Sequence, residues 1–352
     1  MKRGDPPGGG RGPSFAAAPR HPGLVMERKT LVAASLAIVL IFTVAPVAAA
    51  YKTENVIVVV FDGVRQEEMF EEASHSNVPT LWNVLAPQGT LYTNVRNGND
   101  FTNTTPGHST ILTGTYSPGQ VNGVRPVDPT LFELFRKQTA ISKDKTWLVA
   151  QKRQNPEEAV YSTNPDYGKE YGPDIIKNRI GKNDNQTLRH LKMVMKKYRP
   201  RLVLVNLGWT DEAAHHQSLS AYLQAIGNSD RIAGVVWKQI QDDPFYANRT
   251  TLILTSDHGR MSYKFKGHGD PVDPSCRHIW ALVIGPDTPA GVVYEEQADM
   301  RQIEPTAAAL LGVANPAGLM DPLPGAVTPG WMPSSLRQLI LRLCSSGLHH
   351  LV

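Results

Sequence analysis

The stretch NVIVVVFDGV, residues 55–64, joins a continuous apolar run to an aspartate and a glycine. Apolar residues without alternation are typical of a strand that is covered on both faces, as in a parallel sheet. We therefore expect a strand over Asn55–Phe61 that delivers Asp62 at its carboxyl end. An aspartate there is more often a turn former or a helix cap, but a buried carboxylate requires a cation or several donors.

The rest of the chain repeats this pattern of apolar runs separated by segments of helical periodicity. Such alternation predicts the α/β class, a three-layer sandwich with a mostly parallel central sheet and helices on both faces. The further predicted strands are Thr146–Ala150, Arg201–Leu207, Thr251–Thr255 and Trp280–Ile284. The predicted helices are Thr80–Leu85, Thr130–Lys137, Gln186–Tyr198, Leu219–Gln241 and Pro305–Leu311.

The composition is that of an ordinary globular protein, with 41% hydrophobic and 19% charged residues among 352. The formal net charge is +4, and much of the excess lies near the N-terminus. The remainder is close to neutral, which argues against a nucleic-acid partner. Cys276 and Cys344 are too few for a disulfide framework, and a single bridge between them stays an open alternative.

The N-terminal segment has the pattern of an export signal. Residues 1–25 are rich in Gly, Pro and Arg and lack an apolar period, which predicts a disordered leader. From Met26, a basic pair, an apolar run over 31–44 and an alanine-rich site describe a secretory signal cleaved after about Ala50. We expect an exported protein, periplasmic or extracellular. The alternative is a retained membrane anchor, which Pro46 and the short apolar run disfavour.

Acidic and histidine residues follow several of the predicted strands. Asp62 follows the first, Asp211 lies shortly after the third, and Asp257 and His258 follow the fourth. In open α/β sheets, ligands bind beyond the carboxyl ends of the strands. We therefore expect these side chains to converge on one crevice.

The spacing within these segments suggests metal ligands. Asp211 and His215 in NLGWTDEAAHH share one face if the segment is helical, although a solvated pair is the alternative. Asp257 and His258 in LTSDHGR both reach a metal only where the chain turns, or at two separate sites; the alternative is a capped turn. His268 in KGHGD lies between two glycines, and the histidine of CRHIW competes for its role.

The segment FTNTTPGHSTILTG, residues 101–114, supplies candidate nucleophiles. Its hydroxyls belong to Thr102, Thr104, Thr105 and Ser109, at the start of a helix-like stretch. A helix N-terminus favours anions, and a metal bound to a hydroxyl oxygen would turn it into a nucleophile. Helix capping is the alternative role, and the segment alone does not separate the two.

Taken together, these segments resemble the alkaline phosphatase superfamily, most closely its nucleotide pyrophosphatase/phosphodiesterase branch. The motifs stand in the family's order over roughly residues 54–315, and linking stretches such as GHSTILTG also look similar. The spacing to Pro106 and His108 identifies Thr104 as the nucleophile by this resemblance. The implied organisation is a leader and signal over 1–50, a phosphohydrolase domain over 51–315 and a tail over 316–352.

The resemblance implies two metal sites, with Zn²⁺ suited to their mixed nitrogen and oxygen ligands. One site would be formed by Asp62, Asp257, His258 and the Thr104 oxygen, and the other by Asp211, His215 and His268. Two such ions suit in-line displacement at phosphorus. The expected function is hydrolysis of small-molecule phosphate esters through a covalent phospho-threonine.

The chain departs from the family at the residues that should grip the substrate. The phosphodiesterase branch carries an Asn roughly 20 residues after the nucleophile, where this chain offers Asn122 and Arg125. Lys152 in WLVAQKRQ stands where phosphomonoesterases of the superfamily use a cation, although a solvated charge is as good an interpretation. The choice between monoester and diester therefore stays open.

Two alternative functions conflict with the sequence. A sulfatase needs a Cys or Ser that becomes formylglycine, and neither Thr104 nor His108 fits its motif. A non-catalytic exported binding protein of the same fold would have lost ligands, and all seven positions are retained. We therefore expect an enzyme.

Overall fold

The computed structural model describes residues 51–151, 156–178, 183–318 and 320–327, all within the unit that begins at Ala49. The predicted leader and signal, Lys152, Cys344 and most of the predicted tail lie outside these ranges. Within them, no helix has both the length and the apolar character required to cross a membrane.

The described residues form a nine-stranded sheet in the order β4-β3-β5-β1-β6-β7-β2-β8, with β9 also paired to β2. The strands are β1 (Asn55–Phe61), β2 (Thr90–Arg96), β3 (Thr146–Ala150), β4 (Asp174–Lys177), β5 (Leu202–Leu207), β6 (Thr250–Thr255), β7 (His278–Ile284), β8 (Val292–Tyr294) and β9 (Ala298–Asp299). Only β7 runs antiparallel to its neighbours, β6 and β2, in this part of the chain. The predicted mostly parallel sheet is confirmed.

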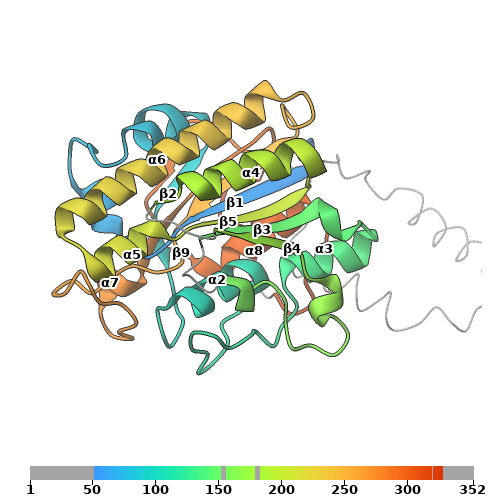
Figure 1. Cartoon of the computed structure of the whole chain (residues 1–352), viewed down its shortest axis with the longest axis horizontal. Coiled ribbons are helices and arrows are strands. Elements are labelled where there is room, and N and C mark those ends of the chain that lie inside the picture. Colours follow the sequence, from blue (N-terminus) through green and yellow to red (C-terminus); the bar gives the residue numbers. More distant parts are fainter. Residues whose placement is uncertain (1–50, 152–155, 179–182, 319, 328–352) are drawn as a thin grey trace, which may run out of the picture. The chain divides into compact units, whose positions relative to one another are not determined.

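Helices cover both faces of the sheet (Figure 1). The helices are α2 (Thr104–Thr113), α3 (Leu131–Thr139), α4 (Asn185–Tyr198), α5 (Trp209–His216), α6 (Leu219–Asp242), α7 (Pro274–Arg277) and α8 (Ile303–Leu310). Alternate residues of β1 point to opposite faces: Val59 joins a core beneath α4 and α6, and Val58 joins one beneath α2, α3 and α8. The predicted three-layer sandwich is therefore confirmed.

The elements that the sequence did not predict lie mainly toward the edges of the sheet. Thr93 and Asn94 interrupt the apolar run of β2, while β8 and β9 are too short to leave a pattern. The predicted helix at Thr80–Leu85 is a single wide turn, η2 (Leu81–Leu85), capped by Asp230, whose carboxylate accepts hydrogen bonds from the amides of Thr80 and Leu81. These edges depend on partners that are distant in sequence.

The register of the central strands brings the candidate residues together. Phe61 of β1 pairs with Leu207 of β5, and Val60 pairs with Thr255 of β6. The carboxyl ends of β1, β5 and β6 therefore lie side by side, as expected for a parallel sheet. The chain segments that follow these three strands therefore all leave the sheet on the same side, at the carboxyl ends of the strands.

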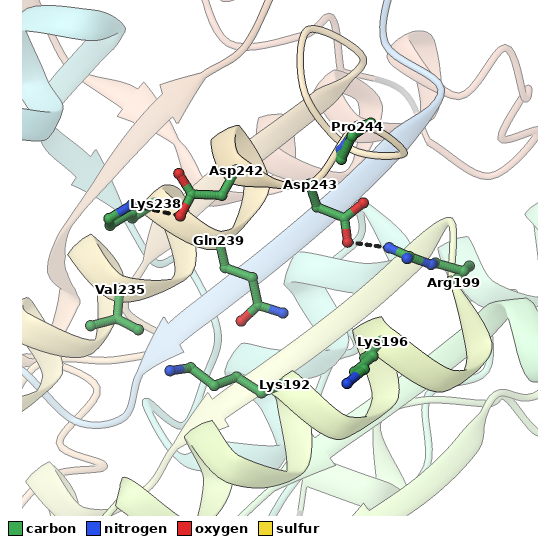
Figure 2. A pocket seen from close by; sticks show the side chains of 9 residues that line it. All are labelled: Lys192, Lys196, Arg199, Val235, Lys238, Gln239, Asp242, Asp243 and Pro244. Carbon is green, nitrogen blue, oxygen red and sulfur yellow. Dashed lines mark hydrogen bonds and ion pairs between the residues drawn. The ribbon is translucent and has the colours of Figure 1, made fainter.

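A groove of about 570 Å³ lies elsewhere, between the C-terminal halves of α4 and α6 (Figure 2). Two of its carboxylates are already ion-paired, Asp243 with Arg199 and Asp242 with Lys238. None of the residues that line it belongs to the strand-end motifs. The candidate site is therefore separate from this groove.

Candidate metal centre and nucleophile

Asp62 occupies the carboxyl end of β1 with its side chain fully buried. Its Oδ2 accepts a hydrogen bond from Asn206 Nδ2 at 2.6 Å. Burial raises the pKa of Asp62 well above its usual range, and the charges of Asp257 and Asp211 raise it further. Several carboxylates are thus crowded into a dry site, an arrangement that a bound cation would stabilise.

Three buried polar atoms face one another at the carboxyl end of β1: Asp62 Oδ1, Asp257 Oδ2 and His258 Nε2. None of them has a hydrogen-bond partner among the described residues. His258 Nε2 lies 3.7 Å from Asp62 Oδ1 and 3.6 Å from Asp257 Oδ2. His258 Nδ1 donates to the Gly259 carbonyl at 2.8 Å, which leaves the Nε2 lone pair facing the carboxylates. This donor set fits a divalent metal ion.

A second cluster lies next to the first and contains Asp211, His215 and His268, whose ligand atoms lie within 4.8 Å of one another. Asp211 and His215 are both in α5, as the four-residue spacing requires, and His215 Nε2 lies 3.3 Å from Asp211 Oδ2. His268 Nε2 approaches His215 Nε2 to 3.0 Å. Two imidazole nitrogens this close to each other and to a carboxylate are suited to sharing a metal ion.

The protonation of this second cluster favours metal binding. Burial lowers the pKa of His268 to about 3, so its imidazole is neutral at physiological pH. His268 Nδ1 donates to Asn103 Oδ1 at 2.9 Å, which directs Nε2 inward. Burial disfavours the Asp211 carboxylate, but His215 and Arg260 outweigh it and hold its pKa well below the usual range. Both groups therefore present lone pairs.

Helix α2 begins at Thr104 and is fastened to the first cluster. Gly107 packs so closely that an added Cβ would lie 2.3 Å from the Asp257 carbonyl oxygen. His108 Nδ1 donates to the Thr104 carbonyl at 2.9 Å, and its Nε2 lies 3.2 Å from Asn206 Nδ2. Nδ1 is also 3.2 Å from Asp257 Oδ2, without hydrogen-bond geometry. The ring of His108 therefore orients the first turn of α2 on the carboxylates.

The other hydroxyls of this segment accept hydrogen bonds from neighbouring loops. Thr102 Oγ1 accepts from the Gly269 amide at 3.1 Å, and Thr105 Oγ1 accepts from the Gly123 amide at 3.1 Å. Ser109 Oγ accepts from the Gln120 side chain at 2.9 Å. These contacts give the three other hydroxyls structural roles, while Thr104 lies at the N-terminus of α2.

The structure brings one of the three candidate substrate-binding residues to the nucleophile segment. Asn122 Oδ1 accepts from the Thr105 amide at 2.9 Å. The Arg125 guanidinium instead stacks 3.5 Å from the centre of the Tyr161 ring and donates to the Glu157 carbonyl at 3.1 Å. Lys152, the third candidate, is outside the described residues.

Sequence reasoning missed several residues that hold the site together. Asn206 interrupts an otherwise apolar β5, which was a usable signal for a buried polar contact. Asn103 and Arg260 carry no such signal, because their roles depend on partners elsewhere in the chain. Arg260 is fully buried and forms an ion pair with Asp211.

The model of the type I phosphodiesterase/nucleotide pyrophosphatase family matches residues 56–305. A search of curated proteins found no similar sequence.

Solved structures show the same fold at low sequence identity. A protein of the alkaline phosphatase superfamily from Vibrio parahaemolyticus matches with a TM-score of 0.56 and 15% identity, over 78% of this chain and 70% of that one. The lipoteichoic acid synthase of Listeria monocytogenes matches with a TM-score of 0.57 and 15% identity, over 78% and 76%. Murine ectonucleotide pyrophosphatase/phosphodiesterase 5 matches with a TM-score of 0.52 and 14% identity, over 78% and 97%. The chain belongs to the type I phosphodiesterase/nucleotide pyrophosphatase family, within the alkaline phosphatase superfamily.

Proposed function

We propose that this protein hydrolyses phosphodiesters with Thr104 as nucleophile and two divalent metal ions as cofactors. The observation that carries the proposal is the convergence of Asp62 Oδ1, Asp257 Oδ2 and His258 Nε2, all buried and without hydrogen-bond partners among the described residues. The second cluster, around Asp211, supplies the other half of a two-metal site. Mixed His and Asp donors favour Zn²⁺.

The residues of the site suggest how the reaction would proceed. Bound ions would lower the pKa of the Thr104 hydroxyl and stabilise negative charge on the phosphoryl oxygens. The Thr104 oxygen would attack phosphorus and expel one alcohol of the diester; water would then cleave the phospho-threonine and release a monoester. The N-terminus of α2 and the Asn122 amide are suited to the developing negative charge.

A diester suits this site better than a monoester. A diester carries one negative charge at neutral pH, whereas a monoester carries up to two. The described candidate beside the nucleophile segment, Asn122, is neutral, and the Arg125 charge faces Tyr161. The family match supports the same preference. We further infer export to the periplasm or the extracellular space from the signal-like pattern before Tyr51.

A rate comparison on two substrates tests the proposal. The purified protein would be dialysed against a chelator, reloaded with Zn²⁺ and assayed on bis-p-nitrophenyl phosphate and p-nitrophenyl phosphate. We expect the diester to be cleaved with the higher kcat/KM, and chelation to abolish the activity. A faster monoester reaction would overturn the diester preference, and no hydrolysis by metal-loaded protein would overturn the proposal.

A further inference from the structure

We propose that Arg260 is a positioning residue that holds two ligands of one metal site, Asp211 and His268, in fixed positions relative to each other. The inference rests on the proposed metal centre. Its guanidinium joins a side chain of α5 to the loop that leads to His268, two segments that are distant in sequence.

The contacts of Arg260 divide between these two segments. Nη1 donates to Asp211 Oδ1, while Nε donates to the Phe265 carbonyl and Nη2 to the Lys266 carbonyl at 3.0 Å. The last two carbonyls immediately precede Gly267 and His268. A planar guanidinium fixes three acceptors at once, so the position of one ligand depends on that of the other.

The carboxylate of Asp211 lies between Arg260 and the two histidines of its cluster. Arg260 Nη1 donates to Oδ1 of Asp211, which also lies 3.7 Å from His268 Nε2, whereas Oδ2 lies 3.3 Å from His215 Nε2. The hydrogen bond from Arg260 therefore restricts the orientation of a carboxylate that faces both histidines.

Arg260 also makes the two sites electrostatically unequal. The first site combines two carboxylates, Asp62 and Asp257, whereas the single carboxylate of the second is balanced by the Arg260 charge. With less negative charge, the Asp211 site is expected to bind the second, weaker equivalent of metal. Its affinity should depend on Arg260, because the contacts of Arg260 join Asp211 to the loop that leads to His268.

Zinc titration of Arg260→Lys, monitored by competition with a chromophoric chelator, tests this inference. Lysine keeps the charge but lacks the planar guanidinium that donates to several acceptors at once. We therefore expect the weaker equivalent of zinc to bind about 10- to 100-fold less tightly and the affinity for the tighter equivalent to be unchanged. Arg277→Lys is the matched control, because Arg277 donates to the Pro271 carbonyl of the same loop without contacting a candidate ligand. It should leave both affinities unchanged.

If Arg260→Lys binds two equivalents of zinc with wild-type affinities, the proposed role of Arg260 is overturned, while the proposed metal centre stands. No metal bound by the unmodified protein would instead overturn the metal centre. Should Arg260→Lys fail to fold, nitrogen-15 spectra of arginine side chains in the unmodified protein decide. A slowly exchanging Nε–H signal that shifts with the weaker zinc equivalent is expected, and the absence of such a response would overturn the inference.

Discussion

Replacing Gly63 with alanine is expected to destabilise the protein and weaken its metal binding. Gly63 follows Asp62 with a φ of +63°, and an added Cβ would lie 2.7 Å from Asp211 Oδ1 and 2.8 Å from Arg260 Nη1. The left-handed backbone costs alanine about 1–2 kcal/mol, and crowding in a packed core costs a further ~1–3 kcal/mol. The free energy of unfolding should therefore fall by about 2–5 kcal/mol.

A second glycine separates the two contributions. Gly312 has a φ of +68°, and a Cβ added there meets nothing within 4 Å. Urea unfolding of metal-free Gly63→Ala and Gly312→Ala should differ by the crowding contribution alone, about 1–3 kcal/mol. Equal stabilities would refute the close packing around Gly63, and unchanged zinc affinity in Gly63→Ala would refute its link to Asp211.

Three further substitutions test the nucleophile, the substrate contact and a buried carboxylate. Thr104→Ala should lower kcat on the diester by at least about 10³-fold in a steady-state assay, whereas Thr104→Ser keeps the attacking oxygen and part of the rate. Asn122→Ala should lower kcat/KM about 10²-fold at unchanged metal content; an unchanged value would exclude the amide from substrate binding. Burial raises the pKa of Asp184 from 3.8 to about 7. As pH rises through that window, the unfolded chain loses this proton while the folded protein keeps it, so the free energy of unfolding falls. In urea unfolding, the stability of Asp184→Asn relative to the unmodified protein should increase by about 3 kcal/mol from pH 5 to pH 8. A difference that does not change with pH would contradict this.

The sequence predicted the part of the fold that depends on local pattern. The runs over Asn55–Phe61 and Thr146–Ala150 are apolar throughout because both faces of these strands are covered, and their predicted bounds match the structure. Strand β4 has its side chains partly exposed at the edge of the sheet, so it lacks that signal. Pairing partners, rather than local composition, determine such edge strands.

The candidate site shows the same division. The convergence of Asp62, Asp211 and Asp257 followed from the rule that parallel strands end at one edge, and the structure places the three together. Spacing alone did not show where Arg125 points, because its stacking on Tyr161 depends on a segment more than thirty residues away. The role of Arg260 depends similarly on contacts between separate segments.

The central claim is that the buried aspartate and histidine clusters form a two-metal centre for diester hydrolysis. Its most direct test is a zinc titration of the metal-free protein, with the initial rate on bis-p-nitrophenyl phosphate measured after each addition. We predict negligible activity without metal and a rate that rises to a plateau at about two equivalents per chain. Full activity in the metal-free protein, or a plateau at one equivalent, would contradict the two-metal centre.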